Sequence, residues 1–447
     1  TSSVTLSGSG KTISGGGSIT FNNLTISGSI TSNQNIGVTG NFTNNGTFTP
    51  STNTVTFSGS SDATISGTTS PTTFNNLTVS KTSASVSLGI DISGNGALSV
   101  SSGTLKIGSM STLPTFNTYS LTGGTVEYNG SSSQTVAAQN YGNLTSSGSG
   151  ARVLASSGTI GIAGTFTTGS NSYTTTGSTV DFTSSSSQTI PALSYNNVSN
   201  SGNGNRTIAS SGTVGIGGTF SIGSGTYTTT GSTVNFSGST QSIPALAYNN
   251  LTTSGSGTKT LSGTTSASGN LSLSAGSFAD GGNTLTVNGN ITNAVAHSGT
   301  GKILLSGGSS AHTLSGSGSY TNLQLNDANG ISVSSNDLTV NGTLTLSSGN
   351  ITTSSNKVII GSSGSISRTS GHVVGNLQKN VVGGTSSKTF EIGNSSNYLP
   401  VDITFTSVST SGNLTVSTTN GDHPNIATSL IRSDKSVNRY WTLINVQ

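Results

Sequence analysis

The sequence predicts an all-β protein: a parallel β-helix (a β-solenoid of about 18 residues per coil) over residues 1–375, followed by a small antiparallel β-sandwich-like domain over residues 376–447. Three observations lead to this fold class. Charged residues and helix formers are scarce, one short phrase recurs along the chain, and aliphatic residues recur at a step of 18.

The composition excludes several classes of protein. Only 6% of the 447 residues are charged, whereas about 25% is usual for globular domains. No apolar run approaches the roughly 18 residues of a membrane-spanning helix, so we expect no transmembrane segment. The 14 Lys and Arg residues are scattered and the formal net charge is only +3, which argues against a nucleic-acid partner. The chain has no Cys, which is compatible with export without disulfides.

A four-residue phrase recurs six times. The spacings between the starts of successive copies are 53, 67, 54, 53 and 72, and the values 54 and 72 are three and four times 18. Repeats of this length indicate a solenoid, a propeller or an array. A propeller blade needs about 40 to 50 residues of antiparallel hairpins, whereas the short alternating runs here end at turn dipeptides. The copies are FNNL at Phe21, FNNL at Phe74, YGNL at Tyr141, YNNV at Tyr195, YNNL at Tyr248 and YTNL at Tyr320.

Seven aliphatic residues follow the step of 18 without a break. A solenoid explains such a series, because each coil must stack an apolar side chain on that of the coil below. About 21 coils would fill residues 1–375. We expect the following residues to line up inside one tube: Val126, Leu144, Ile162, Val180, Val198, Ile216 and Val234.

Two further features recur at fixed places in the units. Asn pairs at 22/23, 75/76, 196/197 and 249/250 predict a turn whose Asn amides bond the backbone of an adjacent coil. One aromatic series allows two interpretations, a stripe that stacks on sugars or packing at a corner of the solenoid, and we favour packing. Its members are Tyr128, Tyr141, Tyr195, Tyr248 and Tyr320.

The segment 376–447 differs from the rest of the chain. It holds nine of the 25 charged residues and the single Trp, and its strand-like runs are longer. Such runs suit a small antiparallel sandwich. The chain stops inside or just after the last run and begins without an initiator Met, so we expect a piece of a longer polypeptide and an incomplete sandwich. Its last strand, with Tyr440, Trp441 and Leu443, is a possible edge that pairs with another chain.

The closing stretch resembles a known family. The segments at 388–405, 421–429 and 436–443, with the YNNLT-type units at 195–199 and 248–252, are similar to the large repetitive surface proteins that Bacteroidetes-type bacteria secrete through the type IX pathway. The resemblance implies export across an outer membrane, an extracellular or cell-surface location, and adhesin-like or structural roles. It brings no family-wide catalytic residues, and it leaves the mode of anchoring open.

No catalytic, cofactor-binding or metal site is expected. Polysaccharide lyases and hydrolases also use parallel β-helices, but they need clustered carboxylates. Here the solenoid acids are at least ten residues apart, and we expect them to face solvent. The four His residues lack metal-binding spacing and are expected on the surface or in loops. SGSGKT near Lys11 lacks the first Gly of a P-loop, and the Thr-rich YTTTGST recurs only every third coil, which is too sparse for an ice-binding array.

We therefore expect a non-enzymatic, secreted or cell-surface β-solenoid that acts as a stiff stalk, adhesin shaft or fibre component, associated with an outer membrane. Two alternatives stay open: a carbohydrate-binding or carbohydrate-cleaving β-helix, and a cargo or accessory component of a type IX secretion or gliding machinery. The expected partners are surface glycans, other copies of the chain or outer-membrane secretion proteins.

Overall fold

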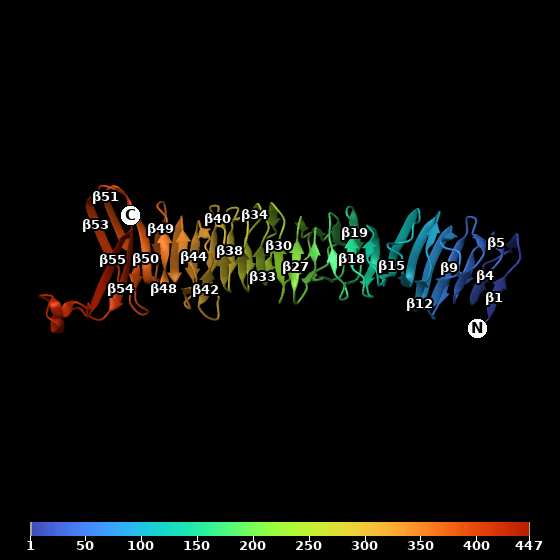
Figure 1. Ribbon diagram of the computed structural model, residues 1–447, viewed down its shortest axis with the longest axis horizontal. Coiled ribbons are helices and arrows are strands. Elements are labelled where there is room, and N and C mark those ends of the chain that lie inside the picture. Colours follow the sequence, from blue (N-terminus) through green and yellow to red (C-terminus); the bar gives the residue numbers. More distant parts are fainter. Residues whose placement is uncertain (1, 447) are drawn as a thin grey trace. The chain divides into compact units, whose positions relative to one another are not determined.

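A computed structural model describes residues 2–446 of the chain, which are almost entirely β-strand and turn. Two compact units, residues 1–228 and residues 229–447, are described separately. In both units most strands pair in parallel with a strand one coil further along the chain, so that the coils stack (Figure 1). The fold is a parallel β-solenoid of about 20 turns, as the sequence predicts.

The first unit contains one long parallel sheet that visits every coil. Its strands are β1 (Ser3–Leu6), β4 (Asn23–Ile26), β7 (Phe42–Asn44), β10 (Ala63–Ser66), β12 (Asn76–Leu88), β14 (Ala97–Lys106), β15 (Thr118–Tyr128), β17 (Asn140–Ser146), β19 (Thr159–Ile162), β22 (Thr179–Phe182), β25 (Asn197–Ser199) and β28 (Phe220–Ser221). The same sheet also includes β3 (Ile19–Phe21), β6 (Ile36–Val38), β9 (Thr54–Gly59) and β20 (Phe166–Thr167). The other strands of this unit are β2 (Lys11–Ile13), β5 (Ser29–Ser32), β8 (Thr47–Thr49), β11 (Thr72–Phe74), β13 (Ile92–Gly94), β16 (Gln134–Val136), β18 (Arg152–Leu154), β21 (Tyr173–Thr174), β23 (Gln188–Ile190), β24 (Ser194–Tyr195), β26 (Arg206–Ile208), β27 (Thr213–Ile216) and β29 (Tyr227–Thr228).

The second unit contains a seven-stranded parallel sheet along one side. It is made of β32 (Ala247–Tyr248), β35 (Thr265–Ala267), β38 (Thr284–Val287), β41 (Lys302–Leu305), β44 (Leu323–Asn326), β47 (Thr343–Ser348) and β49 (Ser365–Arg368). The other solenoid strands of this unit are β30 (Thr233–Phe236), β31 (Gln241–Ile243), β33 (Asn250–Thr253), β34 (Thr258–Leu261), β36 (Leu271–Leu273), β37 (Ser277–Ala279), β39 (Ile291–Asn293), β40 (Ala296–Ser298), β42 (His312–Ser315), β43 (Ser319–Tyr320), β45 (Ile331–Val333), β46 (Leu338–Val340) and β48 (Ile351–Ile360).

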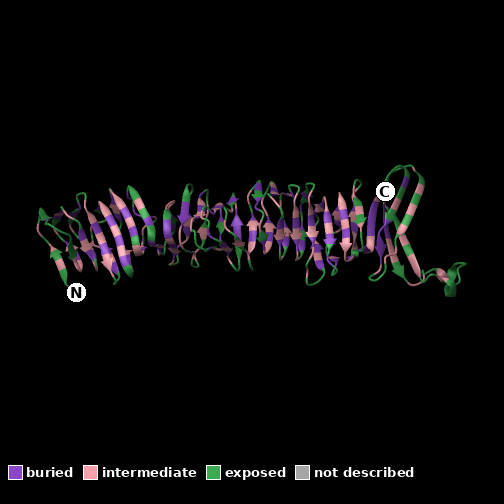
Figure 2. Ribbon diagram, turned by 180° about the vertical axis from the view of Figure 1, so that it is seen from behind, coloured by how far each residue is buried: buried purple, intermediate pink, exposed green. Residues whose placement is uncertain are grey.

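Alternation along each strand builds the core. In β9, Val55 and Phe57 are buried, whereas Thr54, Thr56 and Ser58 between and beside them are partly exposed. Successive residues of a strand point to opposite faces, so the aliphatic and aromatic side chains fill the tube and the hydroxyl residues cover it. Figure 2 shows this pattern, with buried residues alternating with more exposed ones along the strands.

The coils are not all of one length. The step between paired residues ranges from 17, between Val234 and Leu251, to 23, between Phe42 and Ile65. Glycine lets the backbone turn where coils touch. Gly67 has a φ of +131°, and a Cβ at this position would lie 2.0 Å from the carbonyl oxygen of Asn44 in the coil below. Extra residues are therefore absorbed at corners while the strands stay stacked.

The seven residues of the series with a step of 18 are all buried, each at most 1% exposed, but they do not form one column. In the first unit Val126 pairs with Leu144, and Val180 pairs with Val198. Ile162 instead pairs with Tyr141 and Phe182.

The remaining members also lie in other columns, since Val198 pairs with Phe220 and Ile216 with Tyr195. In the second unit Val234 pairs with Leu251. The strict column is wrong because β19 turns both Ile160 and Ile162 inward, and it is Ile160 that faces Val180.

The Asn prediction is confirmed in all six copies of the recurrent phrase. The third residue of each copy accepts a hydrogen bond at its side-chain oxygen from a backbone N–H of the next coil. In the copy at Tyr195, Asn197 Oδ1 accepts from the Thr219 N–H at 2.8 Å. The other bonds are to Asn23, Asn76, Asn143, Asn250 and Asn322, at 2.8–3.0 Å.

The pairing changes from parallel to antiparallel within β50 (Val373–Val381). This strand pairs in parallel with β48 and with β52 (Ile392–Gly393), and it pairs antiparallel with β54 (Gly412–Asn420). β54 pairs antiparallel with β55 (Arg439–Val446), and a separate hairpin joins β51 (Gly384–Phe390) to β53 (Val401–Val408). The antiparallel strands thus continue the last coils through a shared strand. Two short 3-10 helices, η1 (Ile426–Thr428) and η2 (Ser433–Lys435), lie between β54 and β55.

Candidate interaction surface

Exposed apolar side chains gather in one part of the second unit. Eight large hydrophobic side chains are exposed among the described residues, and six of them lie between residues 430 and 444. The other two, Ile19 and Val382, stand singly, so the six form the one cluster of such side chains within residues 2–446, and a cluster of this kind can mark a contact surface for another molecule. The six are Leu430, Ile431, Val437, Trp441, Leu443 and Ile444.

The strand β55 is paired on one side only. It bonds to β54 along its whole length, and within residues 2–446 no strand lies on its other side. Its N–H and C=O groups on that side form an open edge, which is a template for a further strand. The predicted edge residues Tyr440, Trp441 and Leu443 lie on this strand. Trp441 is 38% exposed and Leu443 49% exposed.

The two faces of β55 continue the faces of the sheet. Leu377 of β50 pairs with Val416 of β54, and Val416 pairs with Leu443 of β55. Residues opposite one another in antiparallel strands share a face, so these three side chains form one row. Leu377 and Val416 are fully buried, whereas Leu443 is half exposed at the end of the row.

A loop of residues 421–438 stands beside the start of β55 and extends away from the strands (Figure 1). Its closing contacts are polar: Ser436 Oγ donates to Asp422 Oδ1, and Arg432 pairs with Asp434 at 2.7 Å. A cavity of about 450 Å³ is lined by residues of the loop and of the start of β55, among them Ile426, Ile431, Val437 and Tyr440. The imidazole of His423 packs edge-on against the Tyr440 ring, with centroids 5.0 Å apart.

The recurrent tyrosines are inside the solenoid. Tyr128, Tyr141, Tyr195, Tyr248 and Tyr320 are each at most 3% exposed, so a packing role is confirmed and a sugar-stacking stripe made of these rings is wrong. Their hydroxyls are satisfied locally. Tyr128 and Tyr141 share a hydrogen bond at 3.0 Å, and burial raises the pKa of Tyr128 to about 12, although the hydrogen bond shared with Tyr141 opposes the shift.

Buried cations at the corners are the main feature that the sequence analysis missed. Arg206 is fully buried, and its guanidinium donates to the carbonyl oxygens of Phe182 at 2.8 Å, Ser184 at 2.9 Å, Ser186 at 3.2 Å and Asn205 at 3.1 Å. Arg152, Lys81 and Lys259 are also fully buried and donate to backbone carbonyls in the same manner.

A Gln stands beside three of these cations, one coil earlier. Gln188 pairs with Arg206 in the strand register, and its amide donates to Ile162 O at 2.8 Å and Gly164 O at 2.7 Å. The same register joins Gln134 to Arg152 and Gln241 to Lys259. The two sequence numbers of every such pair differ by the same step of 18, and this recurrent polar spacing is the signal that would have revealed the corners.

Three of the four His residues are buried, which corrects the expectation of surface positions. His297 is 3% exposed, and its Nε2 lies 3.0 Å from Asp280 Oδ2. Its Nδ1 accepts from the Thr321 N–H at 3.3 Å, so the neutral ring satisfies both contacts. Burial lowers the pKa of His297, and the charge of Asp280 opposes this shift only in part.

The second buried pair differs in its contacts. His312 Nε2 lies 3.0 Å from Asp327 Oδ2, and His312 Nδ1 lies 2.7 Å from the carbonyl oxygen of Gly289. Both ring nitrogens thus lie next to oxygen atoms that can accept hydrogen bonds. Burial would raise the pKa of Asp327, but hydrogen bonds from the Asn329 and Gly308 N–H groups and from His312 outweigh it, and the pKa is lowered.

Several carboxylates accept hydrogen bonds from residues of the next coil. Asp62 accepts from the N–H and hydroxyl of Ser85, and Asp181 does so from Ser201. Asp280 and Asp327 are buried, so the expectation that all solenoid acids face solvent is wrong for these two. Within residues 2–446 no three His, Cys, Asp or Glu side chains are grouped so as to hold a metal ion.

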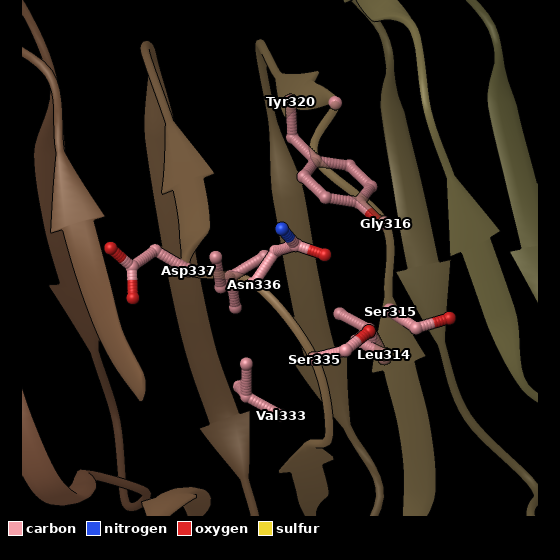
Figure 3. A pocket seen from close by; sticks show the side chains of 10 residues that line it. Leu314, Ser315, Gly316, Tyr320, Val333, Ser335, Asn336 and Asp337 are labelled. Carbon is pink, nitrogen blue, oxygen red and sulfur yellow. The ribbon is translucent and has the colours of Figure 1, made fainter. Parts of the chain in front are cut away.

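A small hollow lies between Leu314 and Leu338. It has a volume of about 10 Å³, the space of a single water molecule, and it is lined by Tyr320, Val333 and Asn336. Asp337 directs its carboxylate away from the Tyr320 ring (Figure 3). It instead accepts from the Lys357 N–H at 3.0 Å.

Comparisons with known proteins add no relative. No protein-family model, curated protein or solved structure matches the chain. Among the described residues, none of the helical segments has the length or apolar character that crossing a bilayer requires.

Proposed function

We propose that the protein is a non-enzymatic structural β-solenoid that serves as a stiff stalk or adhesin shaft at the cell surface or outside the cell. The observation that carries the proposal is the parallel ladder that repeats from coil to coil in both units. In such a ladder the hydrogen bonds run along the solenoid, and each coil is held by its two neighbours alone.

Stiffness follows from how the coils are joined. Every coil contributes strand hydrogen bonds, and in addition Asn side chains and buried cations bond the backbone of the coil before or after. These contacts resist bending because tilting one coil stretches bonds on one side of the tube. Within each unit the stacked coils follow one another at about 4.8 Å per coil.

The cell-surface location rests on the similarity of segments 388–405, 421–429 and 436–443 to type IX secretion cargo. Labelling of intact producing cells with an antibody against the chain tests it, with a cytosolic protein as the control. Labelling only after the cells are broken would contradict a surface location.

Electron microscopy of the isolated chain tests the stalk. We expect elongated particles of uniform length, and a glycan-degradation assay without turnover. Particles that are bent at many positions, or polysaccharide cleavage that is lost when one carboxylate is replaced, would overturn the proposal.

Carbohydrate binding is the second candidate, and one observation favours it. In the first unit a row of hydroxyl residues runs over successive coils on the outer face of the long sheet: Thr56 pairs with Thr78, Thr78 with Ser99, and Ser99 with Ser120. A glycan array separates this candidate from a purely mechanical role. Binding that is lost in Thr78→Val, with Thr12→Val as the control, would support it.

A further inference from the structure

We propose that β55 is a self-pairing edge: two copies of the chain join antiparallel along this strand, with Thr442 on the twofold axis. The inference goes beyond the stalk function and does not depend on it. The open edge and the exposed apolar side chains of Trp441, Leu443 and Ile444 carry it.

The order of residues in β55 is self-complementary about Thr442. Opposite residues of an antiparallel pair share a face. With Thr442 facing Thr442 of the second copy, Trp441 faces the second copy's Leu443, and Tyr440 faces its Ile444, and the symmetry makes each pair twice. Pairs of an aromatic with an aliphatic residue, and of Thr with Thr, are those that stabilise neighbouring strands.

Neighbouring symmetric registers are poorer. Centred on Leu443, the pairing would place Trp441 opposite Asn445. Centred on Trp441, it would place the charged Arg439 opposite Leu443. Only the register centred on Thr442 gives an aromatic–aliphatic pair on both faces of the sheet.

The pairing also completes the sheet. The row that runs from Leu377 through Val416 to Leu443 would continue to the second copy's Trp441, which pairs with Thr418 in its own copy. Ile444, which is 52% exposed on the opposite face, would be covered by Tyr440 of the second copy. The two copies thereby bury apolar surface on both sides of the joined sheet.

Charge does not oppose the contact. Residues 440–446 contain no charged residue and no Pro, the features by which edge strands usually prevent such pairing. Arg439 is held by Thr418 Oγ1 at 3.0 Å, and the antiparallel arrangement puts the two copies' Arg439 at opposite ends. The hairpin of β51 and β53, in contrast, carries Lys388 and Asp402.

Sedimentation velocity of the full 447-residue chain over a range of concentrations tests the proposal. We expect a reversible dimer that weakens at least tenfold in Thr442→Lys, because two ammonium groups would meet at the axis. Thr406→Lys places the same substitution at an exposed position of β53 and should leave the dimer unchanged. A monomer at every concentration, or a dimer that is equally strong in Thr442→Lys, would overturn the proposal.

Cross-linking tests the register without relying on a disruptive variant. The chain has no Cys, so one introduced thiol reports on a single position. Thr442→Cys should form a disulfide dimer rapidly under mild oxidation, because residues opposite one another lie within disulfide reach. Asn445→Cys should not form this disulfide. In the register centred on Thr442, residue 445 of one copy lies opposite residue 439 of the other, six residues along the strand from residue 445 of that copy. Faster cross-linking through Asn445→Cys, or the same slow rate for both, would contradict the pairing about Thr442.

Discussion

At the scale of single residues, buried Arg and Lys side chains stabilise the turns of the solenoid by donating to backbone carbonyls, and no carboxylate of the described residues pairs with them directly. Arg206 meets four backbone carbonyl oxygens, which supply the partial negative charge that a buried guanidinium requires. Burial lowers the pKa of Arg206, while nearby Tyr227 and Asp181 oppose the shift. The carbonyls at a tight corner point inward together, and a planar donor with five N–H groups suits them better than an apolar side chain.

Arg206→Met should therefore lower the free energy of unfolding by about 3 kcal/mol, because several buried carbonyls lose their donor. Urea unfolding followed by circular dichroism measures the effect. Lys11→Met, at an exposed position of the same unit, should stay within about 0.5 kcal/mol of the parent. Equal stability of the two variants would mean that the buried cation contributes nothing to the corner.

His297 should make the stability of the second unit depend on pH. Burial lowers its pKa in the folded chain, against the raising effect of Asp280, so the unfolded chain takes up a proton first as the pH falls below about 6.5. The free energy of unfolding should then decrease with falling pH, at up to about 1.4 kcal/mol per pH unit.

Urea unfolding at pH 7.5, 6.0 and 5.0 measures this slope. It should be shallower in His297→Gln, which removes the titrating ring. His423→Gln changes an exposed imidazole and should keep the slope of the parent. An unchanged slope in His297→Gln would show that other groups cause the dependence.

At the scale of elements, the Asn at the third position of the recurrent phrase joins each strand to the next coil. Asn250 Oδ1 accepts from the Asn270 N–H at 2.8 Å, and Asn270 Oδ1 accepts in turn from the Asn290 N–H at 2.9 Å. These N–H groups stand where the strand begins and where the ladder supplies no partner. The side chain thus extends the ladder by one bond per coil.

Asn250→Ala should cost about 1 kcal/mol of stability, since a backbone N–H near the start of β36 loses its acceptor. Thermal unfolding monitored by circular dichroism would detect this as a lower midpoint. Asn95→Ala alters an Asn of the first unit whose side chain makes no such bond to the next coil, and it should leave the midpoint unchanged. A midpoint for Asn250→Ala equal to that of Asn95→Ala would contradict the role of the bond.

Some features of the strands and turns could be predicted from the sequence, and others could not. Alternation and the recurrent long unit predicted parallel coils, and the Asn turn followed from its fixed position. The prediction that seven aliphatic residues form one column was wrong because strands such as β19 turn two aliphatic residues inward. Periodicity alone cannot tell whether Ile160 or Ile162 stacks on Val180. The buried His297 and Asp280 were missed because their contact joins the end of β37 to the paired strand β40 of the next coil, which no local pattern describes. The edge at Tyr440, Trp441 and Leu443 was visible as an uncharged alternating run, but not its exposure on both faces.

At the scale of the whole molecule, the coil is the unit of construction. Val126 and Val180 lie three coils apart, as the recurrent unit requires, although the individual steps between them differ in length. Because coils contact only their neighbours, whole units should be removable without loss of the fold.

Deletion of residues 158–211, which is one unit of three coils, should leave a folded chain whose melting midpoint lies within a few degrees of the parent. The deletion joins residue 157 to the closely similar segment that begins at Gly212. Deletion of residues 158–202 removes two and a half coils and breaks the register, so this variant should aggregate or melt much earlier. Gel filtration and circular dichroism distinguish the outcomes, and equal tolerance of both deletions would contradict a stacked solenoid.

Burial of basic side chains should protect the chain from trypsin-like proteases. The four fully buried ones are Lys81, Arg152, Arg206 and Lys259. Trypsin-like enzymes must draw a basic side chain into their specificity pocket, and four of the 14 candidates are locked inside the tube. Two exposed ones, Arg432 and Lys435, lie in the loop before β55. Digestion would therefore nick this loop early and leave a long resistant core.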